Sequence, residues 1–243
     1  MVKRIVATTL IALSATALLT AAGCFDSAAQ RRAEREILAV LPDLIGSAEK
    51  YEVDVKGSAS GIMRGRFTSI TVQGTNIQPL DLPPLVRMEA LIENLDFDIA
   101  NRRVRSSGKA TWKGWMADSE LKDILEGRIP LVSSMTVLSK PNFVEITGQM
   151  TLRGVTGQGR VDAIPSIRNN REIWLKPTRV ESLGIGVPIP GWGQRQIENL
   201  INPVYVIESK EIPLVVERIV PEEGKLRLEG TFDPKALSER QLK

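Results

Sequence analysis

Few residues of this chain have the types and the spacing that catalysis, metal binding or disulfide formation requires. Histidine is absent and Cys24 is the only cysteine among 243 residues, so the sequence offers no zinc constellation, no Ser-His-Asp or Cys-His nucleophile and no disulfide framework. The best pairs of acids for a hydrolase are Asp96 with Asp98 and Glu222 with Glu223, but acids at strand ends normally face solvent. We therefore predict no catalytic residue, no metal and no cofactor, and a protein that is not an enzyme.

The position of Cys24 suggests that its thiol is covalently modified. An apolar, uncharged run over residues 5–23 follows two basic residues, which is the pattern of a secretory signal. The stretch "TAAGC" that ends at Cys24 resembles a bacterial lipobox, whose thiol takes a diacylglyceryl group, although Ala21 stands where Leu is usual. We expect export and a lipid anchor at Cys24. Ordinary cleavage after Ala22 or Ala29 and a retained membrane anchor remain the alternatives.

Removal of the predicted signal changes the charge of the protein. Residues 1–23 contain two basic residues and no acid, so Lys plus Arg falls from 32 to 30 against 29 acids, and the net charge falls from +3 to +1. This charge does not favour nucleic-acid binding. We expect residues 1–23 as signal peptide, residues 24–36 as anchor and start of an amphipathic helix, and residues 37–243 as a single β-rich domain.

The hydrophobic period changes once along the chain. Residues 27–50 have helical spacing, with a kink expected at Pro42, and a period of two begins at Tyr51. A motif of two apolar and two polar residues in alternation, closed by glycine, then recurs at residues 53–57, 70–74, 110–114, 144–148 and 226–230. We read each motif as a half-buried strand ended by a glycine at a positive-φ turn or bulge.

Helices are expected over residues 118–126 and 193–201, the first capped by Asp118 or Ser119 and stopped by Gly127. The segment 212–220 is apolar on both faces, so a second layer has to cover the face that does not pack on the core of the sheet. A bound acyl chain or the helix over residues 197–201 can supply that layer.

The order of several motifs resembles one protein family. "YEVDVKG", "GRFTSITVQG", "ATWKGWMADSELKDIL", "IENLINPV" and "IPLVVERIV…GKLRLEG" follow an amphipathic helix that ends near Leu41-Pro42. Between about Ile37 and Phe232 the chain is similar to the LmeA-like phospholipid-binding proteins of bacterial envelopes. The resemblance implies an α+β, mostly β fold, with an elongated curved antiparallel sheet and a few flanking helices that enclose an apolar groove for acyl chains. It implies lipid binding rather than catalysis.

Large apolar side chains near the two later helices and the two-sided strand are our candidates for the groove, because aromatic rings and methionine suit a lipid boundary. Ordinary core packing is the alternative for each of them. The candidates are Trp112, Trp115, Met116, Leu121, Ile124, Leu125, Trp192, Ile197, Leu200, Ile201, Leu214, Val215 and Val216.

These patterns together predict an exported, non-enzymatic protein of the cell envelope that binds phospholipid or another acyl lipid and handles or maintains envelope lipids. The alternative is an envelope scaffold or assembly factor whose sheet edges bind protein partners.

Overall fold

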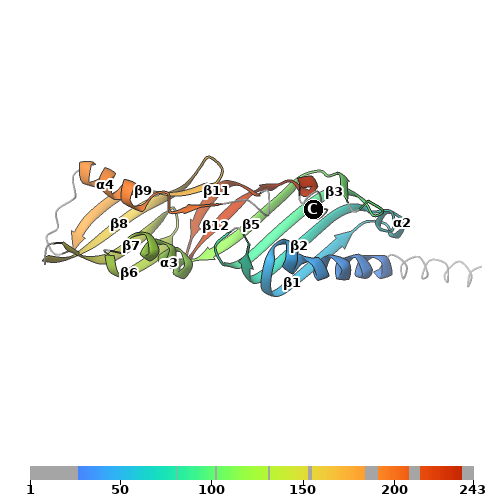
Figure 1. The fold of residues 1–243 in the computed structure, drawn as a ribbon, viewed down its shortest axis with the longest axis horizontal. Coiled ribbons are helices and arrows are strands. Elements are labelled where there is room, and N and C mark those ends of the chain that lie inside the picture. Colours follow the sequence, from blue (N-terminus) through green and yellow to red (C-terminus); the bar gives the residue numbers. More distant parts are fainter. Residues whose placement is uncertain are drawn as a thin grey trace, which may run out of the picture.

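The computed structural model describes residues 27–80, 82–101, 103–130, 132–152, 155–183, 191–207 and 214–236. The molecule is elongated, and its strands form two curved antiparallel sheets that lie end to end (Figure 1). The mostly β, antiparallel fold class expected from the sequence is confirmed. The strands are divided between two sheets, however, whereas one elongated sheet was expected from the sequence.

The first sheet has seven strands in the order β1-β2-β3-β5-β12-β11, with β4 paired to β3 outside this path. The chain's first and last strands thus join the same sheet, because β12 pairs with β5. The strands are β1 (Gly46–Lys56), β2 (Arg66–Pro79), β3 (Leu85–Asp98), β4 (Arg103–Ser106), β5 (Ala110–Ala117), β11 (Leu214–Glu222) and β12 (Lys225–Phe232).

The second sheet has five strands in the order β10-β9-β8-β7-β6, so each strand pairs with its neighbour in the sequence. Such local pairing follows from short hairpin turns, as at Asn169 and Asn170, which both adopt positive φ. The strands are β6 (Val132–Lys140), β7 (Phe143–Leu152), β8 (Val155–Arg168), β9 (Glu172–Leu183) and β10 (Tyr205–Val206).

The described helices are one over residues 27–44, α2 (Ala59–Ile62), α3 (Asp118–Arg128), α4 (Gly191–Ile201) and a single turn over residues 234–236. The prediction of helix to residue 50 was wrong. The helix ends at residue 44 because Gly46, at φ +128°, turns the chain into β1, and a Cβ there would lie 2.0 Å from the carbonyl oxygen of Gln78. Close packing against β2, which no local period reveals, thus decides the boundary.

Two details of α3 also differ from the prediction. Its N-cap is Ala117, without a side-chain hydrogen bond, and the helix continues through Gly127 to Arg128. The carboxylate of Asp118 instead accepts a hydrogen bond from the backbone N–H of Ser139 on β6, at 2.8 Å. A tertiary partner has therefore replaced the local cap.

The recurring glycines do not end their strands by a positive φ. Gly74, Gly114, Gly148 and Gly230 lie inside strands, and none of them adopts positive φ. They instead provide room: a Cβ at Gly230 would lie 1.8 Å from the carbonyl oxygen of Val215, where β11 is irregular. The motif therefore marks close approach between neighbouring strands and side chains rather than turns.

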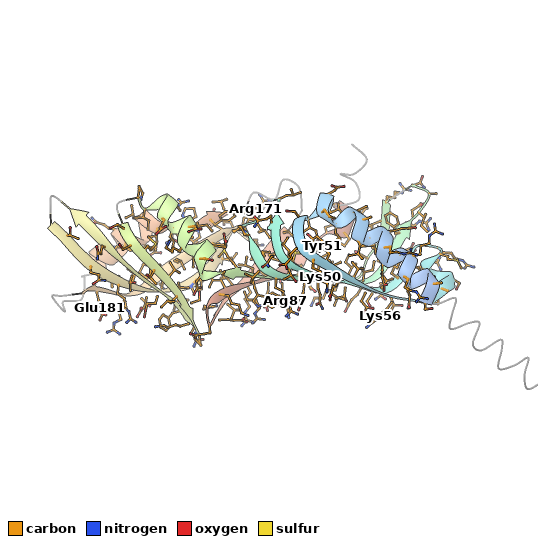
Figure 2. All side chains as sticks on the ribbon, turned by 90° about the horizontal axis from the view of Figure 1, so that it is seen from below. Lys50, Tyr51, Lys56, Arg87, Arg171 and Glu181 are labelled. Carbon is orange, nitrogen blue, oxygen red and sulfur yellow. The ribbon has the colours of Figure 1, made fainter. Side chains whose placement is uncertain are left out.

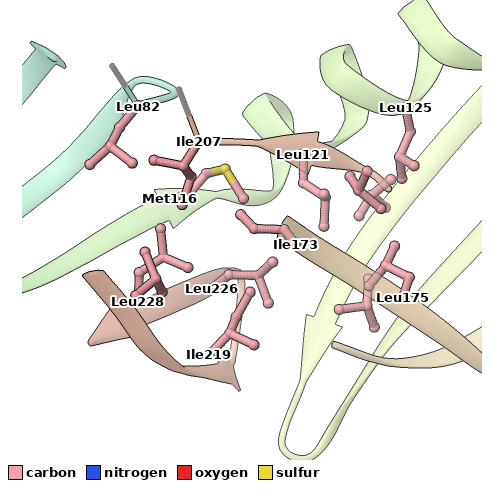
Figure 3. Packing of buried hydrophobic residues seen from close by; sticks show 14 of the residues in the cluster. Leu82, Met116, Leu121, Leu125, Ile173, Leu175, Ile207, Ile219, Leu226 and Leu228 are labelled. Carbon is pink, nitrogen blue, oxygen red and sulfur yellow. The ribbon is translucent and has the colours of Figure 1, made fainter. Parts of the chain in front are cut away.

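The buried apolar residues form two clusters. The first-sheet core lies between the helix over residues 27–44 and the far end of the first sheet, around Leu41, Val55 and Val72. The inter-sheet core, which takes residues from both sheets and from α3, is centred on Met116, Leu121 and Leu226 (Figure 3). The inter-sheet core is contiguous across both sheets, and the burial of its apolar surface, worth about 25 cal/mol per Å², holds the two sheets together.

Candidate functional site

Six of the thirteen predicted groove residues meet in the inter-sheet core. All six are buried, and α3 supplies two of them while β5 supplies another two. They are Trp112, Met116, Leu121, Leu125, Ile201 and Val216. Ile124, Ile197 and Leu214 are partly buried and pack against the same cluster. The interior that the sequence pointed to therefore exists as one contiguous apolar region.

Three other candidates do not face this interior. Trp115 alternates with Trp112 and Met116 along β5 and so projects from the opposite face, where its Nε1 donates to Glu222 and Arg87 lies 5.4 Å from its ring centroid. Val215 alternates in the same way with the buried Val216, and Leu200 is 49% exposed. The side chain of Trp192 lies outside the described residues.

Hydrogen bonds from the side chain of Asn202 fix the end of α4 against the second sheet. The Asn202 amide accepts a hydrogen bond from the N–H of Leu175 and donates one to the carbonyl of Leu175, both at 2.7 Å. It also donates to the carbonyl of Glu198 in the last turn of α4. The amide thus makes the two hydrogen bonds to the buried backbone of Leu175 that a neighbouring strand would otherwise make. These bonds hold the end of α4 over the edge of β9.

Two backbone hydrogen bonds also join the two sheets, and a third ties the start of α3 to the turn between β11 and β12. The N–H of Gly224, between β11 and β12, donates to the carbonyl of Ser139 on β6, and the N–H of Asp118 donates to the carbonyl of Gly224. At the other side of the interior, the N–H of Val216 donates to the carbonyl of Asn170. The interior is therefore framed by polar contacts while its own side chains are apolar.

Sequence reasoning missed much of this interior. Leu226 and Leu228, both fully buried, belong to the last alternating motif, so their period of two was a usable signal. Val204 and Ile207, which follow α4 and are 1% exposed, carry no such period. Only the return of the chain across β9 places them in the core.

The acid pairs are occupied by structural contacts. Asp98 accepts hydrogen bonds from the backbone and side chain of Asn101 and from Arg105. The Asn101 side-chain bond, then its backbone bond, lower the pKa of Asp98 from 3.8 to about 2, with a smaller contribution from Arg105. Glu222 accepts from Trp115 and pairs with Arg227 at 2.8 Å. These carboxylates stabilise turns and strands.

In the part of the chain that the structure describes, no three His, Cys, Asp or Glu side chains are arranged to hold a metal ion. Among the same residues, no helix combines the length and the apolar character needed to cross a bilayer. The predicted signal, the lipobox-like stretch and Cys24 lie outside the described residues.

Comparison with known proteins gives one result. A family model described as LmeA-like phospholipid-binding matches residues 20–231. This range includes almost all the strands of both sheets, the helix over residues 27–44, and α2, α3 and α4. No curated protein and no solved structure gives a significant match.

Proposed function

The chain belongs to the LmeA-like phospholipid-binding family, and on this premise we propose that it binds phospholipid in the inter-sheet core and works without catalysis in the bacterial cell envelope. The family match over residues 20–231 is the observation that carries the proposal. The apolar interior supports it, because acyl chains are bound through the apolar area that they bury.

The dimensions of the second sheet suit an acyl chain. β8 has 14 residues and β9 has 12, which correspond to roughly 40–46 Å of extended strand at ~3.3 Å per residue. One leaflet of hydrocarbon is about 15 Å thick. The strands are therefore long enough to lie along a whole acyl chain. We propose that α3 and α4, which lie at opposite sides of the sheet (Figure 1), separate to admit it.

Native mass spectrometry of the purified protein tests this proposal by detecting co-purified phospholipid. We expect Val216→Phe, at a fully buried position of the inter-sheet core, to lower the amount of bound lipid because the ring occupies the volume of the acyl chain. Val55→Phe is the matched control, since Val55 is equally buried in the first-sheet core. It should cost about 1–3 kcal/mol of stability and leave lipid binding unchanged.

Equal lipid retention by the two variants would argue against a site in the inter-sheet core. Absence of lipid from the wild-type protein, with capture of a defined envelope protein, would favour the scaffold function instead. Either result is independent of the anchor at Cys24.

The envelope location is a separate part of the proposal. Cys24→Ser removes the only thiol, and we expect it to release the exported protein from the membrane fraction, because the two acyl chains of a lipoprotein give stable anchoring. Fractionation after a high-salt wash measures this. A variant that still sediments with membranes would show that another feature anchors the protein.

The proposed lack of catalysis follows from the residues available. Purified protein should release no fatty acid or headgroup from phospholipid or glycolipid esters. A turnover that Asp98→Asn or Glu222→Gln abolishes, while the variant keeps its fold by far-UV circular dichroism, would contradict the proposal.

A further inference from the structure

One end of the molecule combines features that the lipid-binding interior does not use. We define the tip as residues 58–66 with α2, together with the turn between β3 and β4 that contains Ile99 and Asn101. It lies at the end of the first sheet farthest from the second sheet (Figure 1).

The two most exposed large apolar side chains of the described residues lie at this tip. Met63 is 69% exposed and Ile99 is 54% exposed. Their loops are in contact, since the N–H of Phe97 donates to the carbonyl of Gly65 at 2.7 Å, and a Cβ at Gly65 would lie 3.3 Å from Cγ1 of Ile99. Two exposed apolar side chains that are far apart in sequence are thus carried by neighbouring loops.

The loops that carry these side chains are well fixed. Ile62, beside Met63, is buried in the first-sheet core, and the hydroxyl of Ser58 accepts a hydrogen bond from the N–H of Gly61. Asp98 holds the other turn through Asn101. Met63 and Ile99 are therefore exposed on an ordered surface.

Cationic side chains surround this apolar pair. The side chains of Arg64 and Arg103 are exposed, and neither forms an ion pair or hydrogen bond with a described residue. Arg66 and Arg105, in contrast, pair with Asp96, and Arg105 also pairs with Asp98. An open pocket of about 410 Å³ next to Arg64 is lined by Ser58, Ser60, Arg64, Arg66 and Thr68, together with the carboxylate of Asp96, which pairs with Arg66. The hydroxyl and guanidinium groups suit phosphate oxygens.

The course of the chain gives the tip an orientation. The helix over residues 27–44 is followed directly by β1, which runs back beside it, so the helix begins at the end of β1 that carries Lys56 (Figure 2). Ala29 and Ile62 accordingly belong to the same core. Cys24 precedes this helix by three residues, which span at most about 11 Å. Exposed Arg31 and Arg35 add positive charge at the same end.

From these observations we propose that the tip docks on the surface of an anionic phospholipid bilayer. Met63 and Ile99 enter the interface between headgroups and acyl chains, while Arg64 and Arg103 contact headgroup phosphates. Membrane binding of this kind depends on apolar area and on attraction between cations and anionic lipids together. The long axis of the protein then points away from the membrane.

Fluorescence from single labelled positions tests the orientation. The full-length chain with Cys24→Ser receives one cysteine at Met63, Ile99, Leu138 or Ile164, which carries an environment-sensitive dye. Leu138 and Ile164 are exposed apolar controls on the second sheet. On phosphatidylcholine vesicles that contain phosphatidylglycerol, we expect a blue shift and quenching by spin-labelled lipid at Met63 and Ile99 only.

The charge requirement has its own matched variants. Arg64→Gln with Arg103→Gln should lower the apparent affinity of the labelled tip for anionic vesicles by about tenfold or more. Arg171→Gln, at an exposed arginine on the second sheet, should leave it unchanged. High salt should have the same effect as the double substitution.

Two results would overturn the proposal. Dyes at Met63 and Ile99 that remain in water, as at the control positions, would show that the tip does not enter the bilayer. Insertion that is equal on vesicles of phosphatidylcholine alone would remove the role of the arginines. Neither result bears on lipid bound in the inter-sheet core, which mass spectrometry detects separately.

Discussion

The first-sheet core and the inter-sheet core are covered in different ways. The first-sheet core is covered by the helix over residues 27–44, whose Ala29, Ala33, Ile37 and Leu41 lie four residues apart on one stripe. The inter-sheet core is covered by α3, by the end of α4 and by strands from both sheets. One continuous helix closes the first core, whereas several segments, distant in sequence, have to meet to close the second.

This difference assigns different roles to the two cores. A core closed by one helix that leads directly into β1 has a simple, local architecture, which suits a structural role. A core closed by several separate elements can open by small movements of one of them, and Met116 at its centre adapts to changes of shape. This difference is consistent with the proposal that an acyl chain binds in the inter-sheet core, and the following experiments test the distinction.

The largest expected effects come from cavities in the two cores. Leu41→Ala and Leu121→Ala each remove a buried leucine and should each cost about 2–5 kcal/mol in the free energy of unfolding. Added phospholipid should raise the melting temperature of the Leu121→Ala protein, because an acyl chain can occupy that cavity. It should have less effect on Leu41→Ala. Equal recovery of the two variants would remove the distinction between the cores.

A smaller effect is expected where the glycines allow close packing. Gly230→Ala places a Cβ against the carbonyl oxygen of Val215, within the strand pair that borders the inter-sheet core, and should destabilise the protein by about 1–3 kcal/mol. Gly127→Ala is the control, because nothing lies within 4 Å of a Cβ there. In the helix α3 it should stabilise by about 0.5–1 kcal/mol. Urea denaturation of both variants measures the difference.

The smallest expected effect is electrostatic and concerns Asp98, at the end of β3 in the first sheet. The pKa of Asp98 is lowered in the folded protein from 3.8 to about 2, so its ionised form stabilises the fold above the unfolded pKa. That stability is lost as the pH falls from 3.8 to about 2. The melting temperatures of the wild-type protein and Asp98→Asn should therefore differ near neutral pH and converge in acid. A difference that is constant with pH would show that Asp98 acts through packing alone.

Local patterns account for much of the secondary structure. Four of the five alternating motifs lie wholly in strands, and the first extends past the end of β1 by Gly57 alone. The helix α4 was predicted to begin within two residues of its observed start and to end at Ile201. The alternation of apolar residues along β3 changes phase at Asn94, where the structure has a positive φ, and the β3–β4 register breaks between Asp96 and Phe97. These features depend on side-chain period and on turn chemistry, which are properties of short segments.

The candidate site was only partly predictable, as β5 illustrates. Trp112, Trp115 and Met116 are all large and lie within five residues, yet only Trp112 and Met116 face the interior. Composition suggested all three, whereas the period of two separates Trp115 from the others. Ile207 and Val204 could not be found from any period, because they lie in a non-helical return after Asn202 that is ordered by β9.

The sequence by itself determined the class of structure and the family, because both depend on the order of short motifs along the chain. It contained the alternation of the strands, the amphipathic stripe of the first helix and the apolar character of β11. The tertiary structure alone decided that the strands divide into two sheets, that Gly46 ends the first helix, and that Met63 and Ile99 share one surface. These features depend on contacts between residues tens of positions apart, and such contacts leave no periodic trace in either segment.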